Sequence, residues 1–386
     1  MKPGVKTSGL RKFLRFAFIY GPGRTVFKAA GRLRIRLPSW RITRMPADVG
    51  LIGCGQFAFT TIGHFLQARF GRRVLVCFDI QPLAAASLAR ALGVPHVAAN
   101  AQALLDTPGL RTVYIASNHA SHAAYATQAL ARGLDVYVEK PVAVELAQLR
   151  MLCAARRSAR GQLFAGYNRP FSAAVRALRK KIKIDLNGGF SLQCCVVGHV
   201  LDADHWYRRP EEGTRVCGNV GHWLDLFVHI LHWRCMPQRL DIALTWADTR
   251  EPDDNLCIAI GSDRGDLCTI TLTARAEPFE GINESIQLQH GSTICKIDDF
   301  RRMTLWQGER VMNRHFWPKD PGHRGAILQP FDRAEPRAWE EVEDSTLLML
   351  HITEMVRSLT RTSTFLPALA REELLKPLAS GDRDRA

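Results

Sequence analysis

Two side chains in the sequence are suited to chemistry at a carbon that carries a hydroxyl group. Lys140 follows a short apolar run at 135–138 that is typical of a buried strand. Ligands collect at the carboxyl edge of a parallel sheet, so an ammonium group there could hydrogen-bond a reacting oxygen. His222 begins a helical stretch after the segment 218–221, and an imidazole suits proton transfer near neutral pH. Lys140 and His222 are therefore candidates for a catalytic pair, and from these residues alone a solvated lysine and a structural histidine stay open as alternatives.

Three further polar residues are predicted to contact the substrate. Asp225 lies one helical turn after His222 and can approach the same helix face. Asn219 can orient a substrate hydroxyl, although an amide cannot exchange its proton near neutral pH. Arg169 is assigned either to the substrate or to a structural salt bridge, and both interpretations stay open.

A metal site is not predicted, although four polar side chains share one helix face. His222, Asp225, His229 and His232 follow one another at spacings of three, four and three. No Cys or second His cluster has the spacing that would complete a site. The apolar residues between them are typical of a helix that faces a core.

A glycine-rich segment between an apolar run and a helical stretch predicts a dinucleotide site. Residues 53–58 read G-C-G-Q-F-A, which is the pattern G-x-G-x-x-A. The first glycine permits a tight turn, the second lets a pyrophosphate approach the backbone, and the alanine keeps the helix close to its strand. Asp79 ends the next apolar run, where a carboxylate can accept from both ribose hydroxyls of the adenosine. The predicted cofactor is NAD rather than NADP, bound by Gly53, Gly55, Gln56, Phe57, Ala58 and Asp79.

The elements that must position these residues differ between the two halves of the chain. Short apolar runs alternate with helical stretches from residue 49 to about 165, which predicts a parallel sheet with helices on both faces. Beyond about residue 170 the strands are longer and tight turns separate them, which predicts a mostly antiparallel sheet. Its predicted strands are 190–200, 240–249, 256–260, 267–276, 284–290 and 293–297, with helices at 220–231 and 345–359.

The fold class is therefore α/β, a Rossmann dinucleotide-binding domain followed by an α/β domain with a large, mostly antiparallel sheet. The predicted ranges are a basic arm at 1–46, the Rossmann domain at 47–168, the second domain at 169–378 and a polar tail at 379–386.

Four segments, in order, resemble the Gfo/Idh/MocA oxidoreductases. They are Ser117-Asn118-His119-Ala120-Ser121-His122, Glu139-Lys140-Pro141, the stretch G-Y-N-R-P-F at 166–171, and His205-Trp206 with residues 213–225. The resemblance covers residue 47 to about 300 and implies that Lys140 and His222 are the catalytic residues. It adds Ser117, Asn118, His122, Glu139 and Lys140 to the cofactor-binding residues. Asn219 departs from the pattern, because many members of the family carry an acid there.

The resemblance implies an NAD-dependent oxidoreductase that transfers a hydride between nicotinamide and a secondary hydroxyl or ketone of a sugar or nucleotide sugar. The expected setting is carbohydrate or surface-polysaccharide metabolism, with a sugar-like substrate and a homo-oligomeric enzyme. One alternative is a glycosidase or lyase that works through transient oxidation and retains its NAD. Another is an NAD-binding scaffold without catalytic activity.

The positive charge of the chain is concentrated in its first 46 residues. The whole sequence has 52 Lys and Arg against 37 Asp and Glu, which gives a formal net charge of +15. Twelve of the basic residues precede Asp48, the first acidic residue, so the remainder has 40 basic and 37 acidic residues. A nearly neutral body argues against nucleic-acid binding, which needs clustered Lys and Arg on the folded surface.

The arm at 1–46 is predicted to form one or two short basic helices, and three interpretations of it stay open. It could pack on the body of the chain or on a partner copy, lie on an anionic membrane surface, or act as an organellar transit peptide. No apolar run approaches the roughly 20 residues that span a bilayer. The expected location is the cytoplasm, including a peripheral position at the inner face of the membrane.

Overall fold

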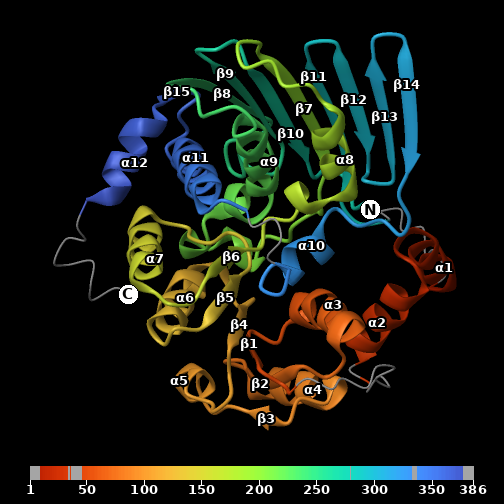
Figure 1. Cartoon of the computed structure of the whole chain (residues 1–386), viewed down its shortest axis with the longest axis vertical. Coiled ribbons are helices and arrows are strands. Elements are labelled where there is room, and N and C mark those ends of the chain that lie inside the picture. Colours follow the sequence, from red (N-terminus) through yellow and green to blue (C-terminus); the bar gives the residue numbers. More distant parts are fainter. Residues whose placement is uncertain (1–8, 34, 36–45, 279, 333–336, 377–386) are drawn as a thin grey trace.

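The computed structural model describes residues 9–33, 35, 46–278, 280–332 and 337–376. In this part of the chain, a six-stranded sheet and a nine-stranded sheet lie in separate regions, and a pair of N-terminal helices lies beside both (Figure 1). The predicted tail at 379–386 and most of the segment that joins the arm to the first strand lie outside the described residues.

The first sheet is parallel, with the strand order β3-β2-β1-β4-β5-β6. Its strands are short and mostly buried on both faces, as a sheet between two helix layers requires. The strands are β1 Val49–Ile52, β2 Val74–Phe78, β3 His96–Val97, β4 Thr112–Ile115, β5 Asp135–Val138 and β6 Leu163–Ala165. The helices are α3 His64–Phe70, α4 Pro82–Leu92, α5 Ala101–Leu105, α6 His122–Ala131 and α7 Leu146–Ser158. This is the predicted Rossmann arrangement.

The second sheet has the order β14-β13-β12-β11-β7-β10-β9-β8-β15, and only the pair β7–β10 is parallel among its described strands. Its first strands are β7 Phe190–Val197, β8 Leu240–Trp246, β9 Leu256–Ser262, β10 Leu267–Thr273 and β11 Asn283–His290. The others are β12 Thr293–Asp298, β13 Arg302–Gln307, β14 Arg310–His315 and β15 Thr362–Phe365. The predicted fold class is confirmed.

Helices cover one face of the second sheet. Buried and exposed residues alternate along β7, β8 and β11, so one face of the sheet joins the core and the other faces outward. The helices of this domain are α8 Ala173–Lys181, α9 Gly221–Leu231, α10 His323–Leu328, α11 Trp339–Arg357 and α12 Pro367–Leu375. Helix α9 packs between the sheet and α11, which places His222 at the junction of the two domains.

The hairpin β13–β14 was not predicted, and the exposure of β14 explains why that strand was missed. Every residue of β14 is at least partly exposed, so the strand has no apolar alternation that a sequence could reveal. It pairs with β13 along its whole length and forms the edge of the sheet. Charged edge strands of this kind protect a sheet from pairing with other chains.

The described part of the arm forms two helices, α1 Gly9–Tyr20 and α2 Pro22–Leu33, that pack on the body of the chain (Figure 1). Phe27 of α2 lies against Phe59, with ring centroids 5.5 Å apart. Gly31 comes so close to Phe59 and Thr60 that a Cβ there would lie within 2.8 Å of both side chains. No helix in the described ranges is long and apolar enough to cross a bilayer.

Candidate active site

The glycine segment forms a tight turn at the carboxyl end of β1. Gly53 has a φ of +89°, and a Cβ at this position would lie 2.5 Å from the backbone oxygen of Ala116. Only glycine fits such a close approach between β1 and the end of β4. Gly55 is exposed, and a Cβ there would meet no protein atom within 4 Å. The loop therefore leaves open space beside Gly55, where a pyrophosphate can reach the backbone.

Asp79 stands beside this loop at the end of β2. One carboxylate oxygen accepts a hydrogen bond from the backbone N of Cys54 (2.7 Å), and the other accepts from the backbone N of Gln81 (2.8 Å). These bonds fix the carboxylate, and each oxygen keeps a further lone pair for a ribose hydroxyl. Together with the open space at Gly55, this donor set fits NAD. A carboxylate here disfavours the 2′-phosphate of NADP.

A valine at Gly55 will weaken NAD binding without unfolding the protein. The new side chain will occupy the open space beside the loop, and we expect NADH affinity to fall by on the order of a hundredfold or more, a loss of roughly 3 kcal/mol. Titration of NADH fluorescence measures the affinity. Gly261→Val is the matched control, because a Cβ there meets only Leu267 at 3.9 Å. A Gly55→Val protein that binds NADH normally would contradict the assignment.

The segment after β4 is held by side chains rather than left free. Ser117 Oγ lies 2.7 Å from Ser121 Oγ. The ring nitrogens of His122 lie 2.8 Å from the backbone oxygen of Pro141 and 3.2 Å from that of Ser117. Both nitrogens of this buried imidazole therefore face backbone oxygens, and the predicted cofactor contact of His122 stays a prediction. His122 joins the Ser117 segment to the segment after β5.

Glu139 and Asn118 also make internal contacts. Glu139 is buried and accepts a hydrogen bond from the Tyr137 hydroxyl (2.9 Å). Burial raises the pKa of Glu139 to about 7. The predicted cofactor contact of Glu139 stays a prediction. Asn118 donates to Glu212 (2.8 Å), so only part of its side chain is available to a ligand.

Glu212 is a positioning residue that the sequence did not reveal. Its carboxylate accepts from Asn118 Nδ2, from the backbone N of His119 (2.8 Å) and from the backbone N of Ala120 (3.3 Å). It is 2 % exposed and belongs to the second domain, so it ties that domain to the segment after β4. No local pattern marks such a residue, because its partners lie more than 90 positions away.

Lys140 lies next to the turn that precedes His222. The Lys140 Nζ donates to the backbone oxygen of Gly218 (2.6 Å), which leaves two N–H donors of the ammonium for other partners. Gly218 belongs to a π-helical turn, Val216–Val220, that runs directly into α9. A Cβ at Gly218 would lie 2.5 Å from the Tyr207 ring, so the close packing of this turn requires glycine.

His222 is buried in the first turn of α9, with 9 % of its surface exposed. Its Nδ1 has no hydrogen-bond partner among the described residues. Burial holds the pKa of His222 well below its ordinary value, and the positive charges of Arg169 and Lys140 lower it further. The imidazole is therefore neutral at pH 7 and can accept a proton.

Asn219 lies between Gly218 and His222, half-buried. Its Oδ1 is buried and has no hydrogen-bond partner in the described part of the chain. Buried polar atoms are nearly always paired, so an unpaired acceptor beside the candidate catalytic pair marks a place for a donor such as a substrate hydroxyl. The predicted substrate contact of Asn219 stays a prediction.

Asp225 and Arg169 are both engaged in buried ion pairs. Asp225 is fully buried, and its oxygens accept from Arg337 (2.8 and 3.0 Å) and Ser345 (3.0 Å). These bonds join α9 to α11, and the predicted substrate contact of Asp225 stays a prediction. Arg169 donates to both carboxylate oxygens of Glu284 (2.8 and 3.2 Å), so the structural alternative holds for its side chain.

The remaining histidines of α9 face α11. His229 Nδ1 lies 2.8 Å from Glu341, and His232 Nε2 lies 2.8 Å from Asp344. Within the described ranges, no group of three or more His, Cys, Asp or Glu side chains is arranged to hold a metal ion.

A cavity of about 280 Å³ adjoins His222. It lies between the start of the helix after the glycine loop and the second domain, with Thr60 on one side and Arg169 and His222 on the other. Phe57 of the glycine segment packs near His323, another lining residue, with ring centroids 6.0 Å apart. The cavity is therefore next to both the predicted nucleotide site and the candidate base.

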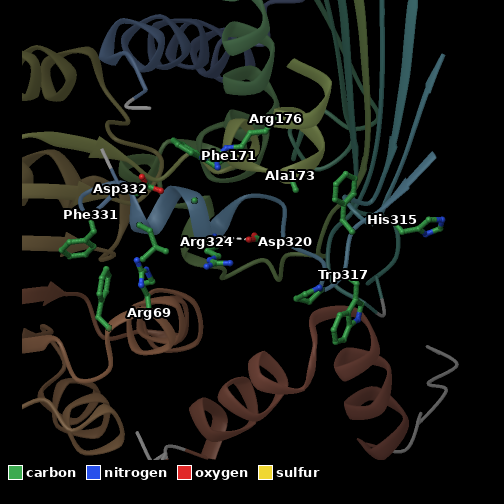
Figure 2. A pocket seen from close by; sticks show the side chains of 15 residues that line it. Arg69, Phe171, Ala173, Arg176, His315, Trp317, Asp320, Arg324, Phe331 and Asp332 are labelled. Atoms are coloured by element: carbon green, nitrogen blue, oxygen red, sulfur yellow. Dashed lines mark hydrogen bonds between the residues drawn. The ribbon is translucent and has the colours of Figure 1, made fainter. Parts of the chain in front are cut away.

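A larger cavity of about 820 Å³ lies elsewhere, around α10. Figure 2 shows Arg69, Arg176 and Arg324 among the side chains that surround it. It shares no lining residue with the glycine loop, Lys140 or His222. Pro318, Asp320 and Arg324 line the larger cavity, and Lys319, Pro321 and His323 line the smaller one. The segment 318–324 therefore separates the two cavities. The smaller cavity is the one placed for chemistry.

Buried His122 will contribute a rise in the free energy of unfolding as the pH increases from about 4 to 6.5. Burial lowers the pKa of His122 from 6.5 to about 4, so the unfolded chain takes up a proton in this range that the folded chain does not. The full effect for this residue is roughly 3 kcal/mol. Glu139, whose raised pKa makes it keep a proton in the fold, opposes this trend between about pH 4.5 and 7. Urea denaturation at several pH values will show the slope, and His122→Gln will reduce it by about one proton. An unchanged slope would contradict the buried neutral His122.

Comparison with known proteins identifies the first domain as an NAD-binding Rossmann domain of an oxidoreductase family. Residues 47–167 match the family model described as "Oxidoreductase family, NAD-binding Rossmann fold". The inositol 2-dehydrogenase of Ralstonia nicotianae is 27% identical over 194 residues, which are 49% of this chain and 54% of that protein. The inositol 2-dehydrogenase of Pseudomonas savastanoi is 31% identical over 140 residues, 36% of this chain and 42% of that protein. The chain thus spans about half of the length of the curated relatives it matches.

The fold of most of the chain also occurs among solved structures. The WlbA dehydrogenase of Chromobacterium violaceum, solved with NADH and UDP-GlcNAcA, superposes with a TM-score of 0.66 at 18% identity. The match covers 86% of this chain and 99% of that one. At this identity the likeness establishes the fold, including the second domain that lies beyond the family match.

Proposed function

We propose that this chain, whose residues 47–167 form an NAD-binding domain of the Gfo/Idh/MocA type, is an NAD-dependent oxidoreductase. Its proposed substrate is a sugar or nucleotide sugar, and the reacting group is a secondary hydroxyl or the corresponding ketone. The observation that carries the proposal is the contact of Lys140 with the turn before His222, a residue that lines the cavity next to the helix after the glycine loop. The inositol and sugar substrates named for similar proteins support the substrate class.

The proposed chemistry divides between the bound cofactor and three side chains. NAD supplies a hydride acceptor when bound in the glycine loop. Oxidation of a CH–OH group to a ketone releases a hydride and a proton, and the neutral His222 takes up the proton. The Lys140 ammonium donates a hydrogen bond to the reacting oxygen and stabilises negative charge that develops on it. Asn219 orients a neighbouring hydroxyl through its unpaired Oδ1.

A scan of sugars and nucleotide sugars tests this proposal. Each compound is incubated with the full chain and NAD, and NADH is followed by absorbance. The expected result is stoichiometric NADH from at least one CH–OH compound. Failure of every compound, with NAD and with the corresponding ketones and NADH, would count against the oxidoreductase.

The two alternative functions give different results in the same assay. A glycosidase or lyase that retains NAD would cleave its substrate without net NADH. A scaffold without activity would keep its cellular role after Lys140→Ala and His222→Ala. No described contact favours either alternative over hydride transfer.

Oligomerisation and membrane contact are further proposals. Buried and exposed residues alternate along β7 and β8, so the outward face of the nine-stranded sheet is not covered by helices. This uncovered face supports a homo-oligomer, which sedimentation can test. Phe13, Leu14 and Phe18 of α1 are exposed beside basic residues, which supports peripheral contact with an anionic membrane. Liposome binding that is unchanged after deletion of residues 1–46 would remove the membrane contact. The metabolic setting and a cytoplasmic location are proposed with the function.

A further inference from the structure

The N-terminal arm forms one wall of the cavity beside His222. Helix α1 is tied to the second domain, because Trp317 Nε1 donates to the backbone oxygen of Phe18 (2.7 Å) and the backbone N of Lys319 donates to that of Ile19 (2.8 Å). Helix α2 is tied to the Rossmann domain through Phe27 and Gly31. Figure 1 shows the two helices beside α3 and near the β14 edge of the second sheet. The arm therefore connects the two domains next to the site.

Two cations of the arm line this cavity. Arg24 and Lys28, one turn apart on α2, are lining residues together with His222. Aromatic rings hold both side chains. The Arg24 guanidinium lies 5.2 Å from the centroid of the Tyr20 ring, and Lys28 Nζ lies 4.0 Å from that of Phe16. Such contacts orient a cation without neutralising it.

The carboxylates near these cations already have other partners. Glu284 pairs with Arg169, and Glu280 pairs with Arg15 and Arg301. The other lining cation, Lys319, pairs with Asp299. Arg24 and Lys28 form no ion pair with any residue that the structure describes. Two positive charges at the cavity therefore have no ion-pair partner among the described residues, and Asp320 is the carboxylate whose charge acts on Arg24 without forming an ion pair with it.

Unpaired buried atoms gather at the same place. Arg24 Nη1, His222 Nδ1 and His323 Nδ1 are buried and have no hydrogen-bond partner among the described residues. All three residues line this one cavity. Because an unpaired buried polar atom is costly, a cluster of three indicates a ligand that would supply the partners.

Burial makes the charges of the arm costly when the cavity holds no anion. It lowers the pKa of Lys28 to about 8, and the neighbouring Arg32 and Arg24 contribute to the shift. Burial also lowers the pKa of Arg24. An anion between the two side chains would relieve both effects, since an opposite charge nearby favours the charged forms.

We propose that Arg24 and Lys28 bind an anionic group of the sugar substrate, a carboxylate or a phosphate, in the cavity that contains His222. This inference rests on the proposed function and narrows its substrate to acidic or phosphorylated sugars. The arm thereby becomes part of the substrate site, with Arg24 and Lys28 as specificity-determining residues. Two of the positive charges that distinguish the arm in the sequence, those of Arg24 and Lys28, would then bind the substrate.

Binding of matched probes to the NADH-loaded full chain tests the proposal. The probes are glucose, glucuronate and glucose 6-phosphate, measured by calorimetry, so that the carboxylate and the phosphate are distinguished. We expect at least one acidic probe to bind about tenfold or more tightly than glucose, as charge-assisted hydrogen bonds provide. Equal binding of all three probes, or no binding of either acidic probe, would overturn the proposal.

Variants of the arm show which residues cause the preference for acidic probes. Arg24→Gln with Lys28→Gln should remove it, whereas Arg11→Ala with Arg32→Ala, an equal loss of charge at exposed positions of the arm, should keep it. If the double Gln variant melts early, the single variant Lys28→Gln, at a partly exposed position, is expected to weaken acidic binding by about threefold or more. If a folded Gln variant kept the preference for acidic probes over glucose, the proposal would be overturned. A weaker affinity of the Gln variant for NADH would also overturn it, because the two cations would then bind the cofactor.

Two further comparisons separate the anion site from membrane binding and from the proposed hydride transfer. Vesicles of phosphatidylcholine and phosphatidylglycerol should bind the wild-type and double Gln proteins equally, and a loss of vesicle binding with intact sugar preference would assign the cations to a membrane. The probe measurements require no turnover. Preserved acid preference without NADH formation from any sugar would therefore count against hydride transfer and leave the anion site standing.

Discussion

Replacing Lys140 with alanine will lower kcat/KM by about a hundredfold to a thousandfold, the cost of removing one donor that stabilises developing charge. The Lys140 Nζ is held by the backbone oxygen of Gly218, so its remaining N–H donors are directed from a fixed position. The variant loses both these donors and a positive charge next to His222. NADH formation from the substrate identified by the sugar scan measures the effect.

The controls for Lys140→Ala separate catalysis from folding and from cofactor binding. Lys180→Ala, at an exposed position in the last turn of α8, should leave kcat/KM within a factor of two. NADH affinity of Lys140→Ala should stay close to that of the wild type if the side chain acts on the reacting oxygen. Because the Lys140 charge lowers the pKa of His222, the acid limb of the pH profile should also move to higher pH in the variant. Full activity in Lys140→Ala would remove Lys140 from the catalytic machinery.

Replacing His222 with glutamine will lower kcat by about a hundredfold to ten-thousandfold, the usual range for loss of a general acid or base. Glutamine keeps the polarity and approximate size of the side chain but cannot take up a proton. Burial and two neighbouring cations hold the pKa of His222 well below its ordinary value, so wild-type oxidation should be insensitive to pH around neutrality. Activity should fall only in acid, where the imidazole becomes protonated and can no longer act as a base.

His351→Gln is the matched control for this substitution. His351 is a partly buried histidine of α11 whose ring contacts Ser363 (2.9 Å), away from the glycine loop and its cavity. Its variant should retain the wild-type kcat and pH profile. If His222→Gln kept both, the proton would have to move through another group, and the assignment of the base would be wrong.

The sequence was informative where chemistry follows from local spacing. Gly53, Gly55 and Asp79 lie within 27 residues of one another on a strand, a turn and a second strand, and the structure brings them together at one sheet edge. The Lys140–Pro141 segment likewise follows a recognisable buried strand. The acid-free arm was also evident from the sequence, although its contact with the site was not.

The partners of charged residues were not predictable in the same way. Asp225 pairs with Arg337 across 112 positions, and Arg169 pairs with Glu284 across 115. Both looked available to substrate because nothing near them in the sequence neutralises them. Glu212 and His323 were missed for the related reason that their environment is created by the meeting of two domains.

The sequence by itself therefore determined the two kinds of sheet and the nucleotide turn. These features depend on hydrophobic periodicity and turn chemistry within about 30 residues, which local sterics and hydrogen bonding dictate. The candidate catalytic pair followed from the family resemblance and stays a prediction. Only the tertiary structure decided which charges are paired and which remain free. Burial and long-range contacts set that balance, and they leave Arg24 and Lys28 of the arm at the cavity beside His222 without an ion pair to any described carboxylate.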